Sequence, residues 1–254
     1  MSTIFNLSGL PQQVRKVVEP YSKGMLKLHG DNLKAIIVYG SSTGEDFIPG
    51  KSNINLLLVF SELKLRHLKL SLKLVARGRK KGIIAPLFLT EKHIATSLDT
   101  FPIEFLEMKE NHVTIYGQDI LETLEIKNDN IRLQCEQQLK GKLIRLRQAY
   151  LEIGLRKKGV EALLIESLTS LIPIFRNMLR LKGWKVSQEK EEIINRIASE
   201  FSVDKDVFLS ILKDKRGDEK IAGIDADKFL EKYLIAINRL AIAVDKLHKS
   251  CPEE

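Results

Sequence analysis

The sequence has little of several residue types that mark particular protein classes. It contains two cysteines, Cys135 and Cys251, in 254 residues. Their number and spacing supply neither a disulfide framework nor a four-ligand zinc site, so the chain is typical of a reducing compartment. Aromatic residues make up 6% of the chain. This scarcity argues against the aromatic stacking platform with which many proteins bind single-stranded nucleic acid.

Long apolar runs are also missing. A membrane-spanning helix needs roughly 20 predominantly apolar residues, whereas the longest runs, 167–175 and 52–61, are bounded by charged residues. Residues 1–11 lack the basic stretch and apolar core of a signal peptide. We therefore expect a cytoplasmic protein that does not associate with a membrane.

The remaining composition is that of an ordinary globular protein, with 44% hydrophobic and 29% charged residues. The length allows a core that needs no disulfide or structural metal. The formal net charge is +8, which favours an anionic partner such as a nucleotide, a nucleic acid or an acidic protein without choosing among them.

Strands and helices alternate in the first half of the chain. The expected helix over 11–29 ends at Gly30, and strands are expected over 35–39, 53–60 and 83–90, with Pro86 suggesting an edge position for the last. A helical stripe contains Leu65, Leu68, Leu72 and Val75. Residues 103–108 and 113–116 are also strand-like. Because side chains alternate along a strand, Asn53 and Asn55 are expected on the same side of the second strand.

Almost everything after residue 128 has helical periodicity. Helices are expected over about 139–153, 160–179, 188–201, 205–215 and 227–249, with a kink at Pro173 and a cap at Asp204. The predicted fold class is therefore α+β, with a mixed-sheet domain over 1–127 and an all-helical bundle over 128–254. Bundles with exposed apolar ridges often form homo-oligomers, which the sequence leaves open.

The loop between the first two strands carries the most specific pattern. Gly40-Ser41 follows the first strand, and Ser52 directly precedes Asn53-Ile54-Asn55 at the start of the second. This order resembles the polymerase-β-like nucleotidyltransferase superfamily, in which Gly-Ser is followed, after a spacer, by Asp-hydrophobic-Asp. The third carboxylate of that superfamily lies on a later strand, where Ile103-Glu104-Phe105 fits. The resemblance covers about residues 30–126. The sequence around Glu104 is similar to that in aminoglycoside adenylyltransferases, whose catalytic domain precedes a helical bundle.

The resemblance implies a role for each matching residue. Gly40, Ser41, Ser42 and Ser52 would bind the phosphates of a nucleoside triphosphate, and Asn53 and Asn55 would occupy the metal-ligand positions. Glu104 would be the catalytic carboxylate, acting as a metal ligand or as the base on the acceptor hydroxyl. In such transferases, two Mg²⁺ ions hold the triphosphate and stabilise the attacking and leaving oxygens. Hard Mg²⁺ prefers carboxylate oxygens.

The sequence departs from the superfamily at both metal positions. Asn53 and Asn55 replace two aspartates, and an amide oxygen is neutral. We expect the Mg²⁺ site to be lost or much weakened, because Glu104 alone supplies too little negative charge for two dications. Read without the resemblance, Gly40-Ser41 is a turn at a strand end, and both asparagines are polar residues at a strand mouth.

Two segments are strongly basic. Residues 64–81 contain eight lysines or arginines and no acid, and Lys69, Lys73 and Arg77 are spaced to form one helical ridge, which Arg79, Lys80 and Lys81 extend. A second group comprises Lys140, Lys142, Arg145, Arg147, Arg156, Lys157 and Lys158. Both could contact phosphates, but such charges are also usual on the solvated faces of amphipathic helices.

Three functions remain open. The first is a pseudoenzyme that retains the fold to bind a nucleotide-like ligand or a partner. The second is an active, divergent nucleotidyltransferase acting on a small molecule or protein, with carboxylates from Glu45, Asp46, Glu104 or Glu107. The third is a basic module that binds RNA or an acidic protein. Loss of two acids favours the first, because it removes the usual two-metal mechanism.

Overall fold

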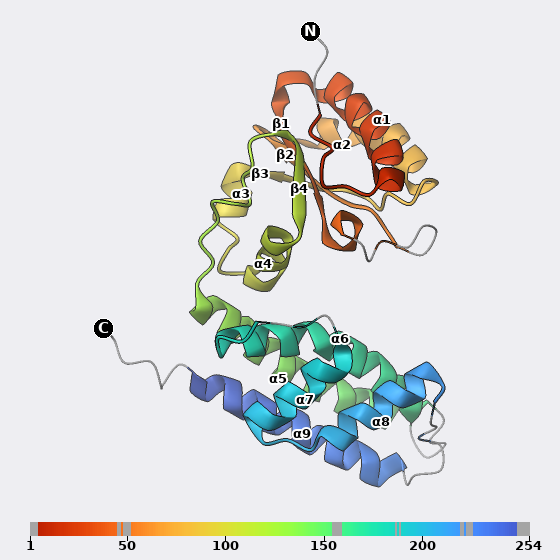
Figure 1. Cartoon of the computed structure of the whole chain (residues 1–254), viewed down its shortest axis with the longest axis vertical. Coiled ribbons are helices and arrows are strands. Elements are labelled where there is room, and N and C mark those ends of the chain that lie inside the picture. Colours follow the sequence, from red (N-terminus) through yellow and green to blue (C-terminus); the bar gives the residue numbers. More distant parts are fainter. Residues whose placement is uncertain are drawn as a thin grey trace, which may run out of the picture. The chain divides into compact units, whose positions relative to one another are not determined.

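A four-stranded mixed sheet organises the first half of the chain, and helices build the second (Figure 1). The computed structural model describes residues 5–44, 47, 52–153, 159–185, 187, 189–218, 221 and 226–247. The chain divides into two units, Met1–Ile126 and Lys127–Glu254. The predicted α+β class with a helical C-terminal region is confirmed.

The sheet brings four chain segments together at one edge. Its order is β3-β2-β1-β4, and the strands are β1 (Leu33–Tyr39), β2 (Asn55–Phe60), β3 (Leu87–Thr90) and β4 (His112–Gly117). β1 runs antiparallel to β2 and β4, while β2 and β3 are parallel. The end of β1 therefore lies on the same side of the sheet as the starts of the other three strands, and this side is called the β1 edge.

Helices cover both faces of the sheet. Side chains alternate along β1, so Ile36 and Val38 pack on one face, against α1 (Gln12–His29) and α2 (Leu65–Arg79). Ala35 and Ile37 pack on the other face, where α3 (Glu91–Ala95) and α4 (Pro102–Glu110) contribute buried residues. A strand buried on both faces is a continuous apolar run, as residues 35–39 of β1 are.

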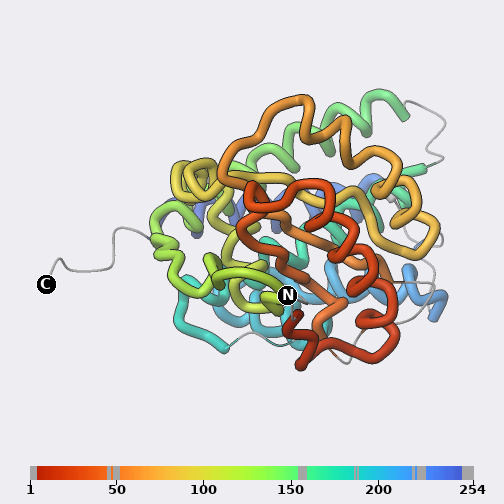
Figure 2. Tube along the Cα trace, turned by 90° about the horizontal axis from the view of Figure 1, so that it is seen from above, coloured from red at the N-terminus to blue at the C-terminus, as the bar shows by residue number. Residues whose placement is uncertain are grey.

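The segment before α1 runs beside the edge strand β4 (Figures 1 and 2). The backbone amide of Asn6 donates a hydrogen bond to the carbonyl of Ile115 at 2.9 Å. The rings of Phe5 and Tyr116 also lie 6.0 Å apart between centroids. Part of this exposed strand edge is thus covered by the chain itself.

Two predicted strands differ in extent from the observed ones. β2 begins at Asn55 rather than at Asn53, and Ile54 forms an isolated parallel bridge to Ile83. β3 begins after Pro86, and it is an edge strand, as the proline predicted. Both observed strands therefore begin later in the sequence than periodicity alone indicated.

The strand predicted over 103–108 is wrong, because these residues belong to helix α4. Pro102 occupies the first helical turn, where its missing N–H removes no hydrogen bond. Phe105 and Met108, which are three residues apart, both pack against the sheet. A short apolar run fits either a strand or a helix, and here the proline and the spacing of three decide.

Helix α2 was predicted correctly, but its leucine stripe does not form the packed face. Leu65 and Leu72 are 65% and 62% exposed. The buried residues are His67, Ser71 and Gly78. A Cβ on Gly78 would lie 2.7 Å from the Tyr21 ring, so α1 approaches α2 closely at this glycine. Of the predicted stripe only Val75 packs against the core, beside Leu74.

The second unit contains five helices in its described residues: α5 (Asn128–Ile153), α6 (Val160–Leu181), α7 (Lys190–Phe201), α8 (Lys205–Arg216) and α9 (Ala226–Lys246). Helix α6 packs against the other four, and it continues through Pro173. The predicted cap of α8 is confirmed, since the Asp204 side chain accepts a hydrogen bond from the Asp206 amide at 3.0 Å.

Helix α6 also corrects the expectation from apolar run length. By length and composition, its 22 residues would be long enough to cross a membrane. However, 56% of its most apolar window is buried within the protein, and the helix contacts all four neighbours. These features are those of a core helix in a bundle, where high hydropathy reflects burial on several sides.

Candidate functional site

The candidate site lies where β1 ends. Tyr39, the last residue of β1, pairs with Asn55 of β2 on one side and with His112 of β4 on the other. The Gly40-Ser41 pair follows directly. Strand pairing therefore brings together the two halves of the predicted motif, Gly-Ser and the asparagine segment, at one edge of the sheet.

Gly40 has a backbone conformation that only glycine adopts readily. Its φ is +76°, and its amide donates a hydrogen bond to the carbonyl of Asn111 at 2.8 Å. A Cβ at this position would lie 3.1 Å from Nδ2 of Asn55. Glycine thus allows the chain to turn and the Asn55 amide to lie against the backbone.

The turn after β1 exposes one serine and buries the other. In the 3₁₀ turn Gly40–Thr43, the Ser42 hydroxyl donates to the Tyr39 carbonyl at 3.1 Å, and Thr43 Oγ1 donates to the Gly40 carbonyl at 2.8 Å. Ser42 is buried, whereas Ser41 is exposed. The Ser42 side chain therefore stabilises the turn, and its predicted direct contact with a ligand is not available in this structure.

The other predicted residues lie immediately before and at the start of β2. Asn53 is exposed, Asn55 is half-buried and Ile54 is buried between them. Ser52 is half-buried. Asn53 and Asn55 do not belong to one regular strand, because β2 begins at Asn55. Both nevertheless lie at the edge where Ser41 is exposed.

Glu104 does not lie on a strand next to the asparagines. It is exposed in the first turn of α4. The opposite end of α4 leads into the site, because Asn111 follows the helix and its carbonyl accepts the Gly40 amide. Glu107 is thus closer along the chain to this edge than Glu104. Glu45 and Asp46, the other suggested carboxylates, lie outside the described residues.

The parallel strand beside Asn53 and Asn55 brings no carboxylate to the edge. The Ile54 amide donates to the Gly82 carbonyl at 2.9 Å, and the Ile84 amide donates to the Ile54 carbonyl at 3.2 Å. Residues 82–87 are Gly, Ile, Ile, Ala, Pro and Leu. The segment that pairs with the asparagine segment therefore offers no acid that could complete a metal site with Asn53 and Asn55.

Comparison with known proteins supports the fold. No protein-family profile and no curated protein sequence matches the chain. Among solved structures, it is similar to spectinomycin adenyltransferase AAD(9) from Enterococcus faecialis, whose crystal structure includes ATP and spectinomycin. The TM-score is 0.53 and the identity 18%, over 89% of this chain and 98% of that chain. The chain has a nucleotidyltransferase-like fold.

Within this nucleotidyltransferase-like fold, the donor set at the strand edge does not fit a pair of Mg²⁺ ions. Asn53 and Asn55 offer neutral amide oxygens, and Mg²⁺ sites in proteins are built on carboxylates. Across the described part of the chain, no group of three or more His, Cys, Asp or Glu residues could hold a metal. Asn53, Asn55 and Ser41 thus supply uncharged hydrogen-bonding groups at this edge.

A contact between a histidine and an aspartate beside the site fixes the start of β4. Nδ1 of His112 lies 2.8 Å from the Lys109 carbonyl, and Nε2 lies 2.9 Å from Oδ2 of Asp119. Both ring nitrogens of His112 therefore face oxygen atoms. Burial raises the pKa of Asp119, but hydrogen bonds from His112 and the Glu122 amide lower it below its ordinary value overall. This pair joins α4, β4 and the following turn.

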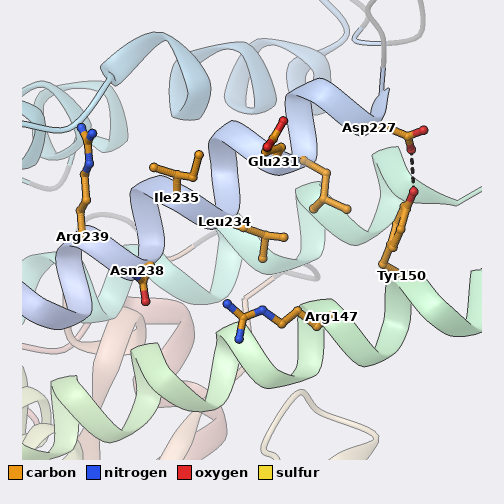
Figure 3. Close-up of a pocket in the computed structure, with 9 residues that line it drawn as sticks. Arg147, Tyr150, Asp227, Glu231, Leu234, Ile235, Asn238 and Arg239 are labelled. Carbon is orange, nitrogen blue, oxygen red and sulfur yellow. Dashed lines mark hydrogen bonds between the residues drawn. The ribbon is translucent and has the colours of Figure 1, made fainter.

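A hollow of about 430 Å³ lies in the second unit between α5 and α9 (Figure 3). Tyr150 donates its hydroxyl hydrogen to Oδ1 of Asp227 at 2.8 Å at one end. Arg147 of α5 and Asn238 of α9 lie on the facing sides. No sequence pattern indicated this hollow, because Tyr150 fits the apolar stripe of α5, and its partner is 77 residues away.

Proposed function

We propose that this chain binds a nucleoside triphosphate at the β1 edge and does not carry out ordinary two-metal nucleotidyl transfer. The observation that carries the proposal is the pair Asn53 and Asn55 beside Gly40-Ser41 in a nucleotidyltransferase-like fold. The similar adenyltransferase structure contains ATP, which supports a nucleotide as the ligand class. Replacement of acids by amides argues against the Mg²⁺-dependent step.

The residues at the edge suit phosphate binding without catalysis. Gly40 allows close approach to the backbone, and the Ser41 hydroxyl is exposed to donate a hydrogen bond. The side-chain amides of Asn53 and Asn55 can also donate to phosphate oxygens. Nucleotidyl transfer needs preorganised positive charge where negative charge develops in the transition state, and neutral amides bind the Mg²⁺ ions that provide it poorly.

A thermal-shift panel tests this function. ATP, GTP, CTP and UTP are each added with and without Mg²⁺, because a ligand that binds the folded state raises Tm according to its affinity. At least one nucleotide is expected to raise Tm, and Ser41→Ala is expected to reduce the shift. The matched control is Ser61→Ala, an exposed serine at the opposite end of β2. No shift with any nucleotide would refute nucleotide binding.

The second candidate is an active, divergent transferase. Glu104 and Glu107 remain as acids on α4, and the similar structure contains a small-molecule ligand, spectinomycin, beside ATP. Incubation with ATP, Mg²⁺ and spectinomycin, followed by measurement of released pyrophosphate, separates the two functions. Mg²⁺-dependent release that Glu104→Gln or Glu107→Gln abolishes would replace the first proposal with this one.

The third candidate is a basic binding module. Lys69, Lys73 and Arg77 are exposed on α2, as their spacing predicted. In the second group, Arg145 and Arg147 are exposed, whereas 156–158 lie outside the described residues. Binding of RNA or of an acidic protein that weakens steeply with salt, without any nucleotide binding, would favour this function.

A further inference from the structure

The basic end of helix α2 is joined by a backbone hydrogen bond to the asparagine segment of the candidate site. Arg79, Lys80 and Lys81 are exposed and directly precede Gly82, whose carbonyl accepts the Ile54 amide at 2.9 Å. Ile54 lies between Asn53 and Asn55. The backbone hydrogen bond thus places the basic end of α2 next to the asparagine segment, although the two are far apart in sequence.

The basic segment is held by a closed turn. The Lys81 amide donates to the Gly78 carbonyl at 2.8 Å, and the Ile83 amide donates to the same carbonyl at 3.0 Å. Gly82 completes the turn with a φ of +86°. The backbone of the basic segment is therefore fixed by hydrogen bonds at both ends. Fixed backbone positions reduce the ordering cost when the lysine side chains contact a ligand.

We propose that Lys80 and Lys81 supply at this edge the positive charge that Mg²⁺ supplies in a catalytic site, so that a triphosphate binds without a divalent cation. The proposal rests on the proposed function and names its phosphate-binding groups. Two aspartates need metal ions before they can approach a phosphate, because the like charges repel. Two neutral amides beside two lysines already form a positive site.

The two asparagines that stand in place of aspartates and the two lysines therefore belong to one electrostatic arrangement. An amide NH₂ group donates hydrogen bonds to phosphate oxygens, which an aspartate cannot do. A lysine ammonium offers three donors and a compact charge that suits phosphate. Without metal, aspartates at 53 and 55 would oppose both contributions. The asparagines are in this sense suited to a metal-free site rather than being remnants of a metal site.

Isothermal titration of the full chain with ATP, and separately with inorganic tripolyphosphate, tests the proposal in EDTA. Both ligands are expected to bind in EDTA, and excess Mg²⁺ is expected to leave ATP binding equal or weaker. Lys80→Ala with Lys81→Ala should weaken binding by about tenfold or more, since each charged hydrogen bond contributes substantially. Lys80→Arg with Lys81→Arg should retain most of it.

The matched control removes two lysines from the same helix. Lys69 and Lys73 are exposed on α2, and at a rise of about 1.5 Å per residue they lie about 10 Å or more along the helix from Lys80. Lys69→Ala with Lys73→Ala lowers the net charge equally, and it should weaken binding less than threefold. Melting without ligand confirms that each variant is folded.

The outcomes separate this inference from the proposed function. Binding of ATP that requires Mg²⁺, or equal weakening by the two lysine pairs, would overturn the metal-free lysine site and leave nucleotide binding intact. Absence of binding under every condition would overturn both. Binding in EDTA that depends on Lys80 and Lys81 but not on Lys69 and Lys73 would establish the site.

Discussion

The side-chain amide of Asn55 lies against Gly40, so closely that a Cβ on the glycine would lie 3.1 Å from Nδ2. Gly40 directly follows β1 and Asn55 begins β2, the adjacent antiparallel strand, so the contact links the turn after β1 to the start of β2. This contact makes the candidate site a single structural feature rather than two separate sequence motifs. It also makes Gly40 a sensitive position.

Replacing Gly40 with alanine should destabilise the first unit and weaken nucleotide binding. Its φ of +76° costs an L-residue about 1–2 kcal/mol, and the new methyl group would press on Asn55. We expect Tm to fall by a few degrees. Gly44→Ala is the control, because Gly44 has a φ of −124° and no atom within 4 Å of an added Cβ. Equal melting of the two variants would contradict the argument.

Much of the first unit could be predicted from local pattern. β1 is a continuous apolar run because it is buried on both faces, and α1 ends at Gly30 as expected. The Gly-Ser and Asn-Ile-Asn segments were recognisable because a site at a strand edge needs particular residues in order. Local periodicity was sufficient to predict an element wherever the burial of each side chain followed the regular repeat of the strand or helix.

The remaining features depend on contacts that are distant in sequence. The run 103–108 is too short for its period to distinguish strand from helix, so α4 was missed. The packed face of α2 includes the close approach of Tyr21 to Gly78, which no periodicity reveals. The basic end of α2 reaches the asparagines through the Ile54–Gly82 hydrogen bond. Such relationships appear only once the sheet order is known.

Acidification should destabilise the packing of α1 against α2 through His29. This buried residue has Nε2 2.8 Å from Ser71 Oγ, and Ser71 donates its own hydrogen to the His67 carbonyl. His29 therefore donates from Nε2, and its buried Nδ1 has no hydrogen-bond partner among the described residues. Burial lowers the pKa of His29, and the nearby His67 lowers it further.

Because the folded pKa of His29 is lowered, the unfolded chain takes up a proton first as the pH falls. Stability from this residue is therefore complete above the unfolded value, about 6.5, and it declines below that pH with a limiting slope of about 1.4 kcal/mol per pH unit. Urea unfolding between pH 5 and 8 should show the decline, and His29→Gln should reduce it. His93→Gln, at an exposed histidine, should leave it unchanged.

Cys135 should be unreactive while the protein is folded. It is fully buried on α5, and burial raises the pKa of its thiol to about 12, although Arg180 acts in the opposite direction. The thiolate is the reactive form. A Cys251→Ser variant isolates Cys135, and iodoacetamide at pH 8 should label it in urea but not in buffer. Rapid labelling of the folded protein would show that the core around α5 opens.

Introducing two acids at the asparagine positions should create or strengthen Mg²⁺ binding. Asn53→Asp with Asn55→Asp places two carboxylates beside Gly40-Ser41, and Mg²⁺ prefers such oxygen ligands. We expect Mg²⁺ to raise the Tm of this variant by a few degrees and ATP binding in EDTA to weaken. Calorimetric titration with Mg²⁺ alone measures the gain in metal affinity directly.

The control for this pair is Gln12→Glu with Gln13→Glu at the start of α1, where both residues are exposed. It adds the same negative charge to the same unit, but adjacent helical residues do not face each other, so their carboxylates do not converge on one ion. A Mg²⁺ response confined to the aspartate variant would locate a metal-ligand position at the start of β2. Equal responses, or no gain in Mg²⁺ affinity, would mean that the asparagines do not occupy metal-ligand positions.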